Sequence, residues 1–282
     1  MREGKLKVAT CQFAVGPDIV RNSIEIQRKI RQAADQGADV AHFPETALSG
    51  YAGTSFSSWK GFKWDVLKEE TLKICNCARE KDIWVILGST HPLRKNIRPH
   101  NSLYVIDSNG KIVERYDKRF LTGSDLRYYS PGNHFSVFTV NGVRCGLLIC
   151  YDVRFPELYR EYKKRGVQLM FHSFHNAAAQ GETIHTVIMR PTLQARAATN
   201  YMWISANNSS RYYQLWSSVC IQPDGRIVSS LRRHSAGLKV TLIDTLASYY
   251  DASGPFRKRA MKGVLNSGIL VNEPRSRDRK CL

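Results

Sequence analysis

The chain has 282 residues, of which 43% are hydrophobic and 23% are charged, and its formal charge is +18 at pH 7. Its length and its recurrent apolar segments exclude a small disulfide-stabilised fold and disfavour disorder, and no run approaches the roughly 18 to 20 apolar residues of a membrane-spanning helix. The basic excess makes nucleic acid worth considering. Because no RNP-type aromatic motif, GXXG segment or helix-turn-helix pattern accompanies it, we expect solvated basic faces and consider nucleic acid an unlikely partner.

The first third of the sequence alternates between strand and helix patterns. Apolar runs predict strands over residues 5–15, 39–45 and 83–90, and apolar residues at helical spacing predict helices over 23–38 and 65–81. This order favours an α/β sheet, whose active loops follow the carboxyl ends of its strands.

The rest of the sequence combines hairpins with further strand and helix units. Asn-Gly turns at 109–110 and 141–142 divide residues 101–118 and 135–150 into hairpins, and a third turn lies at 222–226. Strands and helices together predict mixed sheets covered by helices. The remaining patterns are helices over 155–166 and 191–200 and strands over 167–173, 201–208 and 237–244.

No linker, repeat or abrupt change of composition interrupts the chain before its end. We therefore expect one domain over residues 1–255 and a basic C-terminal tail over 256–282. Residues 255–282 carry eight basic residues against Glu273 and Asp278, which gives this segment a net charge of +6.

The seven cysteines are an odd number without the spacing of a disulfide framework, which indicates reduced thiols. Cys75 and Cys77 do not suggest a zinc site, because no second Cys or His pair stands at a suitable interval. The N-terminus has no signal-peptide pattern. We expect a cytoplasmic protein with no membrane contact.

One cysteine has a position suited to chemistry. Cys150 ends an apolar strand pattern and precedes Pro156, which suits the first turn of a helix. Backbone N–H groups at such a strand-to-helix turn would favour the thiolate and could receive an oxyanion. The alternative is simple packing, because cysteine is among the most often buried residues.

Two charged residues follow other strand patterns. Glu45 comes after an apolar strand, where it could equally cap the next element, and Lys118 leaves the 101–118 hairpin, where lysines are usually solvated. With Cys150 they place a base, a cation and a thiol at three strand ends. Nucleophilic attack at an amide or nitrile carbon requires that set of groups.

Three segments resemble, in order and spacing, the signatures of the nitrilase, or carbon–nitrogen hydrolase, superfamily. They are PETALSGY (44–51), YDKRFL (116–121) and CGLLICYDVRFPELYR (145–160), with further agreement in YYSPG (128–132) and QARAATN (194–200). The resemblance runs from about residue 5 to about residue 245. It implies an α/β fold, a four-layer αββα sandwich with two mixed β-sheets, no metal or organic cofactor, and a homodimer or higher homo-oligomer.

The resemblance also implies that Glu45, Lys118 and Cys150 are catalytic. Glu45 would take the thiol proton, and Cys150 would attack the carbon. Lys118 and the backbone N–H of Tyr151 would stabilise the tetrahedral intermediate. Ammonia or an amine would leave, and Glu45 would then activate water to hydrolyse the thioester. We expect a hydrolase of a small linear amide, with N-carbamoyl amidohydrolase or nitrilase activity as alternatives.

The sequence departs from the family at one position near the lysine. Many members carry a second glutamate there, whereas this chain has Asp125, six residues before Pro131, and its shorter side chain reaches less far. Differences that shape the substrate site are expected in residues 122–130. Tyr51, in the first motif, is a further candidate for binding substrate.

The residues after Cys150 resemble those of amidases acting on carboxylate-bearing substrates, such as omega-amidase, more than the tryptophan–glutamate pair of true nitrilases. Arg154 could hold that carboxylate with two parallel hydrogen bonds. Alternatively, Arg154 forms an internal ion pair, for instance with Asp152 or Glu157.

His175 and Asn176 follow the next strand and are candidate substrate-binding residues, although residues 170–179 do not match the small-residue stretch common in omega-amidases. Two competing hypotheses remain. One is zinc hydrolysis using His172, His175 and His185, for which no H-x-x-x-H or HExxH helix is present. The other is a catalytically idle protein of this fold that binds nucleic acid or serves as a scaffold.

Overall fold

The computed structural model describes residues 3–176 and 180–280. The chain divides into two compact units, the first ending at Asp251 and the second beginning at Ala252. The first unit contains both sheets. The second contains the short helices α5 (Gly254–Met261) and α6 (Pro274–Arg277).

A mixed sheet of six strands forms one inner layer of the first unit, in the order β12-β1-β2-β3-β4-β5. Its strands β1, β2 and β3 are parallel, and each outer strand is antiparallel to its neighbour. The strands are β1 (Lys5–Gln12), β2 (Val40–His42), β3 (Trp84–His91), β4 (His100–Ile106), β5 (Ile112–Asp117) and β12 (Gly237–Asp244).

The second sheet also has six strands, in the order β11-β10-β9-β8-β7-β6, and it is mixed in the same way. Its strands β7, β8 and β9 are parallel, with antiparallel strands on both sides. The strands are β6 (Val137–Val140), β7 (Val143–Ile149), β8 (Leu169–Phe174), β9 (Trp203–Asn208), β10 (Val219–Ile221) and β11 (Ile227–Ser230).

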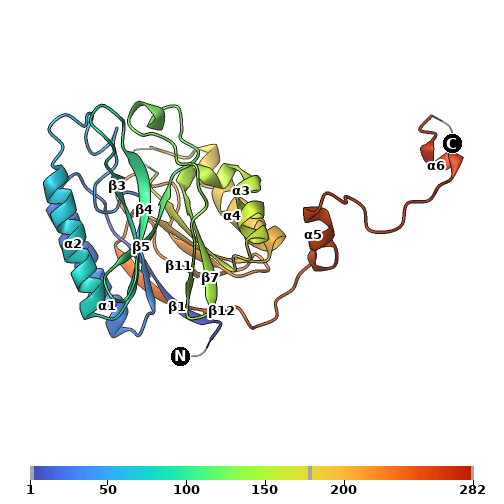
Figure 1. Ribbon diagram of the computed structural model, residues 1–282, viewed down its shortest axis with the longest axis horizontal. Coiled ribbons are helices and arrows are strands. Elements are labelled where there is room, and N and C mark those ends of the chain that lie inside the picture. The colour runs from blue at the N-terminus through green and yellow to red at the C-terminus, as the bar shows by residue number, and fades with distance from the viewer. Residues whose placement is uncertain (1–2, 177–179, 281–282) are drawn as a thin grey trace. The chain divides into compact units, whose positions relative to one another are not determined.

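Helices cover the outer face of each sheet, which confirms the predicted four-layer αββα sandwich (Figure 1). Helices α1 (Ile19–Asp35) and α2 (Trp64–Glu80) pack together on the first sheet, and α3 (Pro156–Lys164) and α4 (Ile184–Asn200) pack on the second. Proline occupies the first turn of α3, as predicted.

Alternation along the strands of the first sheet explains why both of its faces are buried. Val8 and Ile86 belong to the apolar core shared with the second sheet, whereas Ala9 and Val85, their chain neighbours, belong to the core under α1 and α2. Successive side chains of a strand point to opposite faces, so apolar residues at adjacent positions serve two cores. Strand ends near the centre of the sandwich can then place a side chain between layers, out of contact with solvent, as Glu45 and Lys118 are.

Two helices begin earlier than the sequence predicts. Helix α1 starts at Ile19 because the Asp18 side chain accepts the Arg21 N–H at 3.0 Å and caps it. Helix α4 starts at Ile184, capped by Thr183, and contains Pro191 in its interior, so the prediction that it begins at that proline was wrong. Pro191 removes one backbone hydrogen bond without ending the helix.

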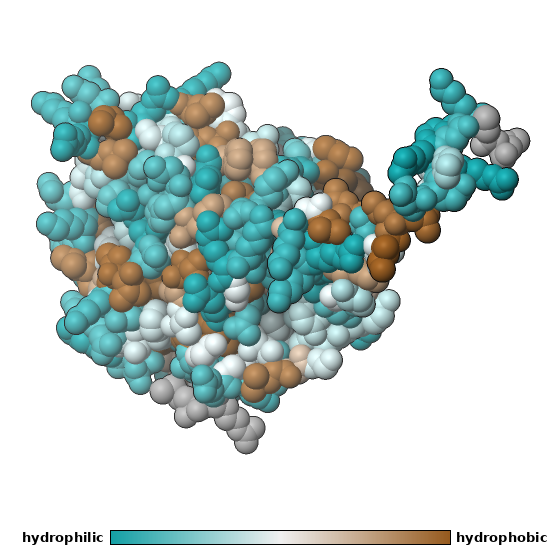
Figure 2. Space-filling view, turned by 45° about the vertical axis from the view of Figure 1, so that its right-hand side comes forward, coloured by the Kyte–Doolittle hydropathy of each residue, from teal (hydrophilic) through white to brown (hydrophobic). Residues whose placement is uncertain are grey.

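The surface is mostly hydrophilic in the view of Figure 2, and apolar side chains form separate patches on it. Within residues 3–176 and 180–280, no helix has the length and apolar character needed to cross a membrane.

Candidate active site

The ends of strands from both sheets bring the predicted catalytic residues together. Glu45 follows β2, Lys118 directly follows β5, and Cys150 directly follows β7, where it opens the short 3-10 turn η2 (Cys150–Arg154). The Glu45 backbone N–H donates to the carbonyl of Phe174 at 3.3 Å and so joins the two sheets. The carboxylate and the ammonium therefore come from the first sheet, and the thiol comes from the second.

A glycine lets the loop that carries Glu45 lie close to β3. A Cβ atom at Gly88 would stand 2.0 Å from the carbonyl oxygen of Pro44, a separation that no larger residue could occupy without displacing the loop. The Gly88 carbonyl also accepts the backbone N–H of Leu48 at 2.9 Å. The absence of a side chain at Gly88 thus helps to fix Glu45.

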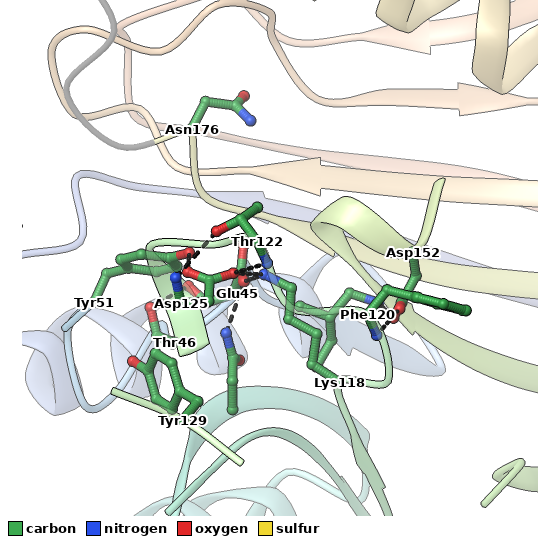
Figure 3. A network of polar contacts seen from close by, with 12 residues as sticks. Glu45, Thr46, Tyr51, Lys118, Phe120, Thr122, Asp125, Tyr129, Asp152 and Asn176 are labelled. Carbon is green, nitrogen blue, oxygen red and sulfur yellow. Dashed lines mark hydrogen bonds and ion pairs between the residues drawn. The ribbon is translucent and has the colours of Figure 1, made fainter. Parts of the chain in front are cut away.

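Glu45 and Lys118 form a fully buried ion pair (Figure 3). The Lys118 Nζ lies 2.9 Å from Glu45 Oε1, and the Asn101 amide donates to the same oxygen at 2.7 Å. The other oxygen, Oε2, has no hydrogen-bond partner among the described residues. One oxygen of the carboxylate is held in place, and the other is free to accept a proton.

Asp125 reaches the lysine despite its shorter side chain. Its Oδ2 lies 2.9 Å from Lys118 Nζ, and its Oδ1 accepts the hydroxyl of Tyr51 (Figure 3). The backbone N–H of Thr122 also donates to Oδ2, at 3.2 Å. Asp125 opens the 3-10 turn η1 (Asp125–Arg127), and its carboxyl is buried beside the ammonium. Lys118 thus lies between two carboxylates.

Burial and the neighbouring charges together determine the pKa values of this cluster. Burial raises the pKa of Glu45, and the charge of Asp125 adds to that, while Lys118 opposes it. Burial alone would lower the pKa of Lys118, but the neighbouring negative charges, Glu45 first, raise it well above the ordinary lysine value. Lys118 therefore stays a cation, and Glu45 is the group of this pair that can exchange a proton.

Cys150 is held in a strained backbone conformation at the head of η2. Its φ is +42°, in the left-handed region that non-glycine residues rarely adopt. Burial raises the pKa of its thiol well above the ordinary value, with the charge of Glu45 adding to the effect, while Lys118 and the backbone N–H of His175 oppose it. Desolvation thus outweighs the nearby donors, and the resting thiol needs a base, the role that the sequence analysis gives to Glu45.

A cavity of about 470 Å³ opens over the thiol. Its wall also includes the apolar residues Val153, Met189, Leu215 and Trp216. The last three gave no sequence signal because they lie outside the three motifs. A mainly apolar wall with a few polar groups is typical of small-molecule sites. Together with Cys150, the cavity is lined by all of the predicted substrate-binding residues, namely Tyr51, Asp125, Tyr151, Arg154, His175 and Asn176.

Arg154 contacts a histidine rather than an acidic side chain. One of its terminal nitrogens bonds to Nδ1 of His185, in the first turn of α4, and the described residues include no ion pair between Arg154 and Asp152 or Glu157. The alternative of an internal ion pair with Asp152 or Glu157 is therefore not found among the described residues, and the Asp152 carboxylate bonds to other donors.

The three histidines of the zinc hypothesis do not form a ligand set. His172 is buried in β8 and bonds to the Tyr159 hydroxyl at 2.6 Å, while His185 bonds to Arg154. Throughout residues 3–176 and 180–280, no three His, Cys, Asp or Glu side chains are placed to hold a metal ion. His175 lines the cavity, and burial lowers its pKa to about 3, so it is neutral.

The profile of the carbon-nitrogen hydrolase family matches residues 7–250. The chain belongs to the carbon–nitrogen hydrolase family. Among curated relatives of this carbon–nitrogen hydrolase, omega-amidase NIT2 of Xenopus tropicalis is 28% identical over 253 residues, covering 85% of this chain and 87% of that protein. Omega-amidase NIT2 of Homo sapiens is 29% identical over 214 residues, covering 71% and 75%. The enzyme is thus a hydrolase of C–N bonds other than peptide bonds.

The fold has close counterparts among solved structures. An amidase from Nesterenkonia sp. superposes with a TM-score of 0.77 at 22% identity, covering 94% of this chain and 98% of its own. At this level of identity the likeness concerns the fold, and it confirms the αββα architecture.

Proposed function

We propose that this enzyme hydrolyses a small linear amide through a thioester on Cys150. The observation that carries the proposal is the buried Glu45–Lys118 pair beside the thiol, in which Glu45 Oε1 is fixed and Oε2 is unpartnered. A thiol with a raised pKa needs a base to become a nucleophile, and a buried carboxylate oxygen without a donor is suited to that task.

In the first half of the reaction, Glu45 takes the thiol proton while the sulfur attacks the carbonyl carbon. The carbonyl electron pair moves to oxygen, and the resulting oxyanion is stabilised by the Lys118 ammonium and the backbone N–H of Tyr151. When the intermediate collapses, the C–N bond breaks and Glu45 returns its proton to the departing nitrogen. Ammonia or an amine leaves, and the acyl group remains on Cys150.

In the second half, Glu45 removes a proton from water, and the oxygen attacks the thioester carbon. The carbon–sulfur bond breaks, the carboxylic acid leaves, and the proton on Glu45 returns to the sulfur. Lys118 keeps its proton throughout, because the two carboxylates around it hold its pKa high. Asp125 has the role of aligning this cation rather than exchanging protons.

We further propose that the preferred amide carries a carboxylate at its other end. Arg154 lines the cavity and has no carboxylate partner among the described residues, so two of its N–H groups can bind a planar anion side by side. The curated relatives above are named omega-amidases, which agrees with this substrate class. Tyr51, His175 and Asn176 complete the binding wall in this proposal.

We also propose a cytoplasmic enzyme that forms a homodimer or a higher homo-oligomer. The six cysteines that the structure describes are all unpaired, which agrees with a reducing compartment. Leu246 and Tyr250 are 71% and 76% exposed and would be suited to burial against a second copy. Light scattering coupled to size-exclusion chromatography tests the oligomeric state.

The decisive experiment measures ammonia release across a panel of amides, carbamoyl amino acids and nitriles. Cys150→Ala should abolish turnover while changing the free energy of unfolding by no more than about 1 kcal/mol, because only a small side chain at a cavity is shortened. Cys145→Ala, in a fully buried strand position nearby, is the matched control and should keep its activity.

Mass spectrometry of the protein quenched during turnover should find the acyl group on Cys150. Full activity in Cys150→Ala, or labelling of another cysteine, would exclude the mechanism. Release only from carbamoyl compounds or nitriles would retain the mechanism and replace the substrate class.

A further inference from the structure

Asp152 takes no part in the proposed proton transfers, yet its carboxylate is completely buried two residues beyond the nucleophile. It accepts three hydrogen bonds. The hydroxyl of Tyr116 donates to Oδ2 at 2.8 Å and the backbone N–H of Ile149 donates to the same oxygen at 3.0 Å. The backbone N–H of Phe120 donates to Oδ1 at 2.9 Å.

The three donors belong to the two chain segments that carry the reactive groups. Tyr116 and Phe120 stand two residues before and two residues after Lys118, in the first sheet and the loop that leaves it. Ile149 directly precedes Cys150 at the end of β7 in the second sheet. In Figure 3 the Asp152 carboxylate meets the Phe120 backbone beside the Lys118 side chain. One carboxylate therefore links the lysine segment to the cysteine turn.

We propose that Asp152 is a positioning residue that fixes the separation and alignment of the Lys118 ammonium and the Cys150 thiol. The proposal rests on the function proposed above, since it concerns the same two groups. They come from different sheets, so contacts across the interface between the sheets determine their distance. An error of about 1 Å in such an alignment can cost on the order of a hundredfold in rate.

A merely structural role explains the choice of residue less well. Burial of a carboxylate is unfavourable, and no cation bonds to Asp152 among the described residues. A carboxylate offers two oxygens with about four acceptor sites, whereas asparagine has the same shape but only one oxygen and an amide that donates. An asparagine would turn its amide N–H2 towards one of these donors, so only the acid can accept all three hydrogen bonds.

The test compares Asp152→Asn with Tyr116→Phe, which removes one donor of the same network and leaves the carboxylate in place. Asp152→Asn should lower kcat about thirtyfold or more and change KM less than threefold, because the substrate still binds the intact cavity. Tyr116→Phe should lower kcat only about threefold. Melting temperatures and circular dichroism establish that both variants are folded. If Asp152→Asn fails to fold, Tyr116→Phe and Asp152→Glu provide the same kcat-against-KM comparison.

A double-mutant cycle separates alignment from general stabilisation. The rate of Cys150 acylation by p-nitrophenyl acetate is measured in wild type, Asp152→Asn, Lys118→Met and the double variant. If Asp152 acts by placing Lys118 against Cys150, then Asp152→Asn should slow acylation less than about twofold once Lys118 is gone. Equal losses in both backgrounds would overturn the proposal, as would an unchanged kcat in Asp152→Asn.

These outcomes also distinguish this inference from the proposed function. Turnover that persists in Cys150→Ala defeats the thioester mechanism itself. An inactive Cys150→Ala together with a fully active Asp152→Asn defeats only the positioning role.

Discussion

The two sheets share one connectivity but supply different chemistry. The first runs β1-α1-β2-α2-β3-β4-β5 and the second runs β7-α3-β8-α4-β9-β10-β11, each with three parallel strands at its centre. The loop after β2, the second parallel strand, carries Glu45, and the end of β5 carries Lys118. In the other sheet the end of β7, the first parallel strand, carries Cys150. A repeated framework therefore does not imply a repeated site.

The groups from the two sheets also differ in burial and charge. Glu45 and Lys118 are 0% exposed and paired, whereas Cys150 is partly exposed to the cavity and uncharged at rest. Changes to the charged pair should thus affect both stability and turnover, because each partner balances the other in a dry environment. Changes on the cavity side should affect turnover while leaving the fold nearly as stable. The following predictions test this difference.

Glu45→Gln should have the largest effect, a loss of about 10²- to 10⁴-fold in kcat, because the amide cannot accept the thiol proton. In the wild type, burial raises the pKa of Glu45, so its base form is lost as the pH falls, starting at a higher pH than for an exposed glutamate. A pH profile of kcat/KM should show this acid limb, and the variant should lack it. If the Glu45→Gln profile keeps the acid limb at the same pH, the limb belongs to another group.

Lys118→Met should lower the free energy of unfolding by about 3–5 kcal/mol, because it leaves the Glu45 and Asp125 carboxylates buried without their cation. Urea unfolding measures the loss, and ammonia release should fall with it. Lys29→Met is the matched control: this lysine is also buried, but it bonds to Glu25 and to a backbone carbonyl outside the site, so activity should persist. If the Lys118→Met protein is as stable as wild type, Lys118 does not offset the burial of the Glu45 and Asp125 carboxylates.

Asp152 should make stability depend on pH in the opposite sense from a salt-bridged acid. Burial raises its pKa from 3.8 to about 6, so its stabilising contribution is complete below pH 3.8 and is lost as the pH rises through 6. The corresponding change in unfolding free energy is on the order of 3 kcal/mol. The unfolding free energies of wild type and Asp152→Asn are measured from pH 4 to 7.5. As the pH rises over this range, the wild type should lose stability relative to the variant. A difference that stays flat would contradict the shift.

Arg154→Lys should have the smallest effect, and only on some substrates. For amides that carry a carboxylate, kcat/KM should fall about tenfold, because lysine cannot form two parallel hydrogen bonds to the anion. Neutral amides of equal length should be affected less than about twofold, since they do not use the guanidinium. Equal losses on both kinds of amide would show that Arg154 does not bind the substrate carboxylate. The roles proposed for the catalytic groups would be unaffected.

Features that depend on local patterns could be predicted from the sequence. Strand ends are recognisable from apolar runs that stop at a polar residue, which is why Glu45, Lys118 and Cys150 could be nominated. The same patterns predicted mixed sheets covered by helices, whereas the four layers were implied by the family resemblance. Contacts between segments distant in sequence could not. Asp125 reaches Lys118 through the turn that carries it, and Asp152 bonds to donors from the other sheet rather than to Arg154. The spacing of the motifs indicates neither of these contacts.

The extent of desolvation around the Cys150 thiol also could not be predicted from the local sequence. The turn at Cys150 suggested a thiolate, because backbone donors are a local feature, but the pKa depends on how much protein surrounds the sulfur. The apolar wall from Met189 and Trp216 likewise comes from α4 and from a loop between β9 and β10, which only the folded chain brings to the cavity.

The left-handed backbone at Cys150 has a consequence for how the protein could change over time. A non-glycine residue in this conformation is less stable by about 1–2 kcal/mol than a glycine would be, and the surrounding fold must compensate. A glycine at this position would relax the backbone and make the protein more thermostable, but it would remove the nucleophile. Selection for stability and selection for activity therefore oppose each other at this one position, and a descendant freed from catalysis is expected to lose its cysteine early.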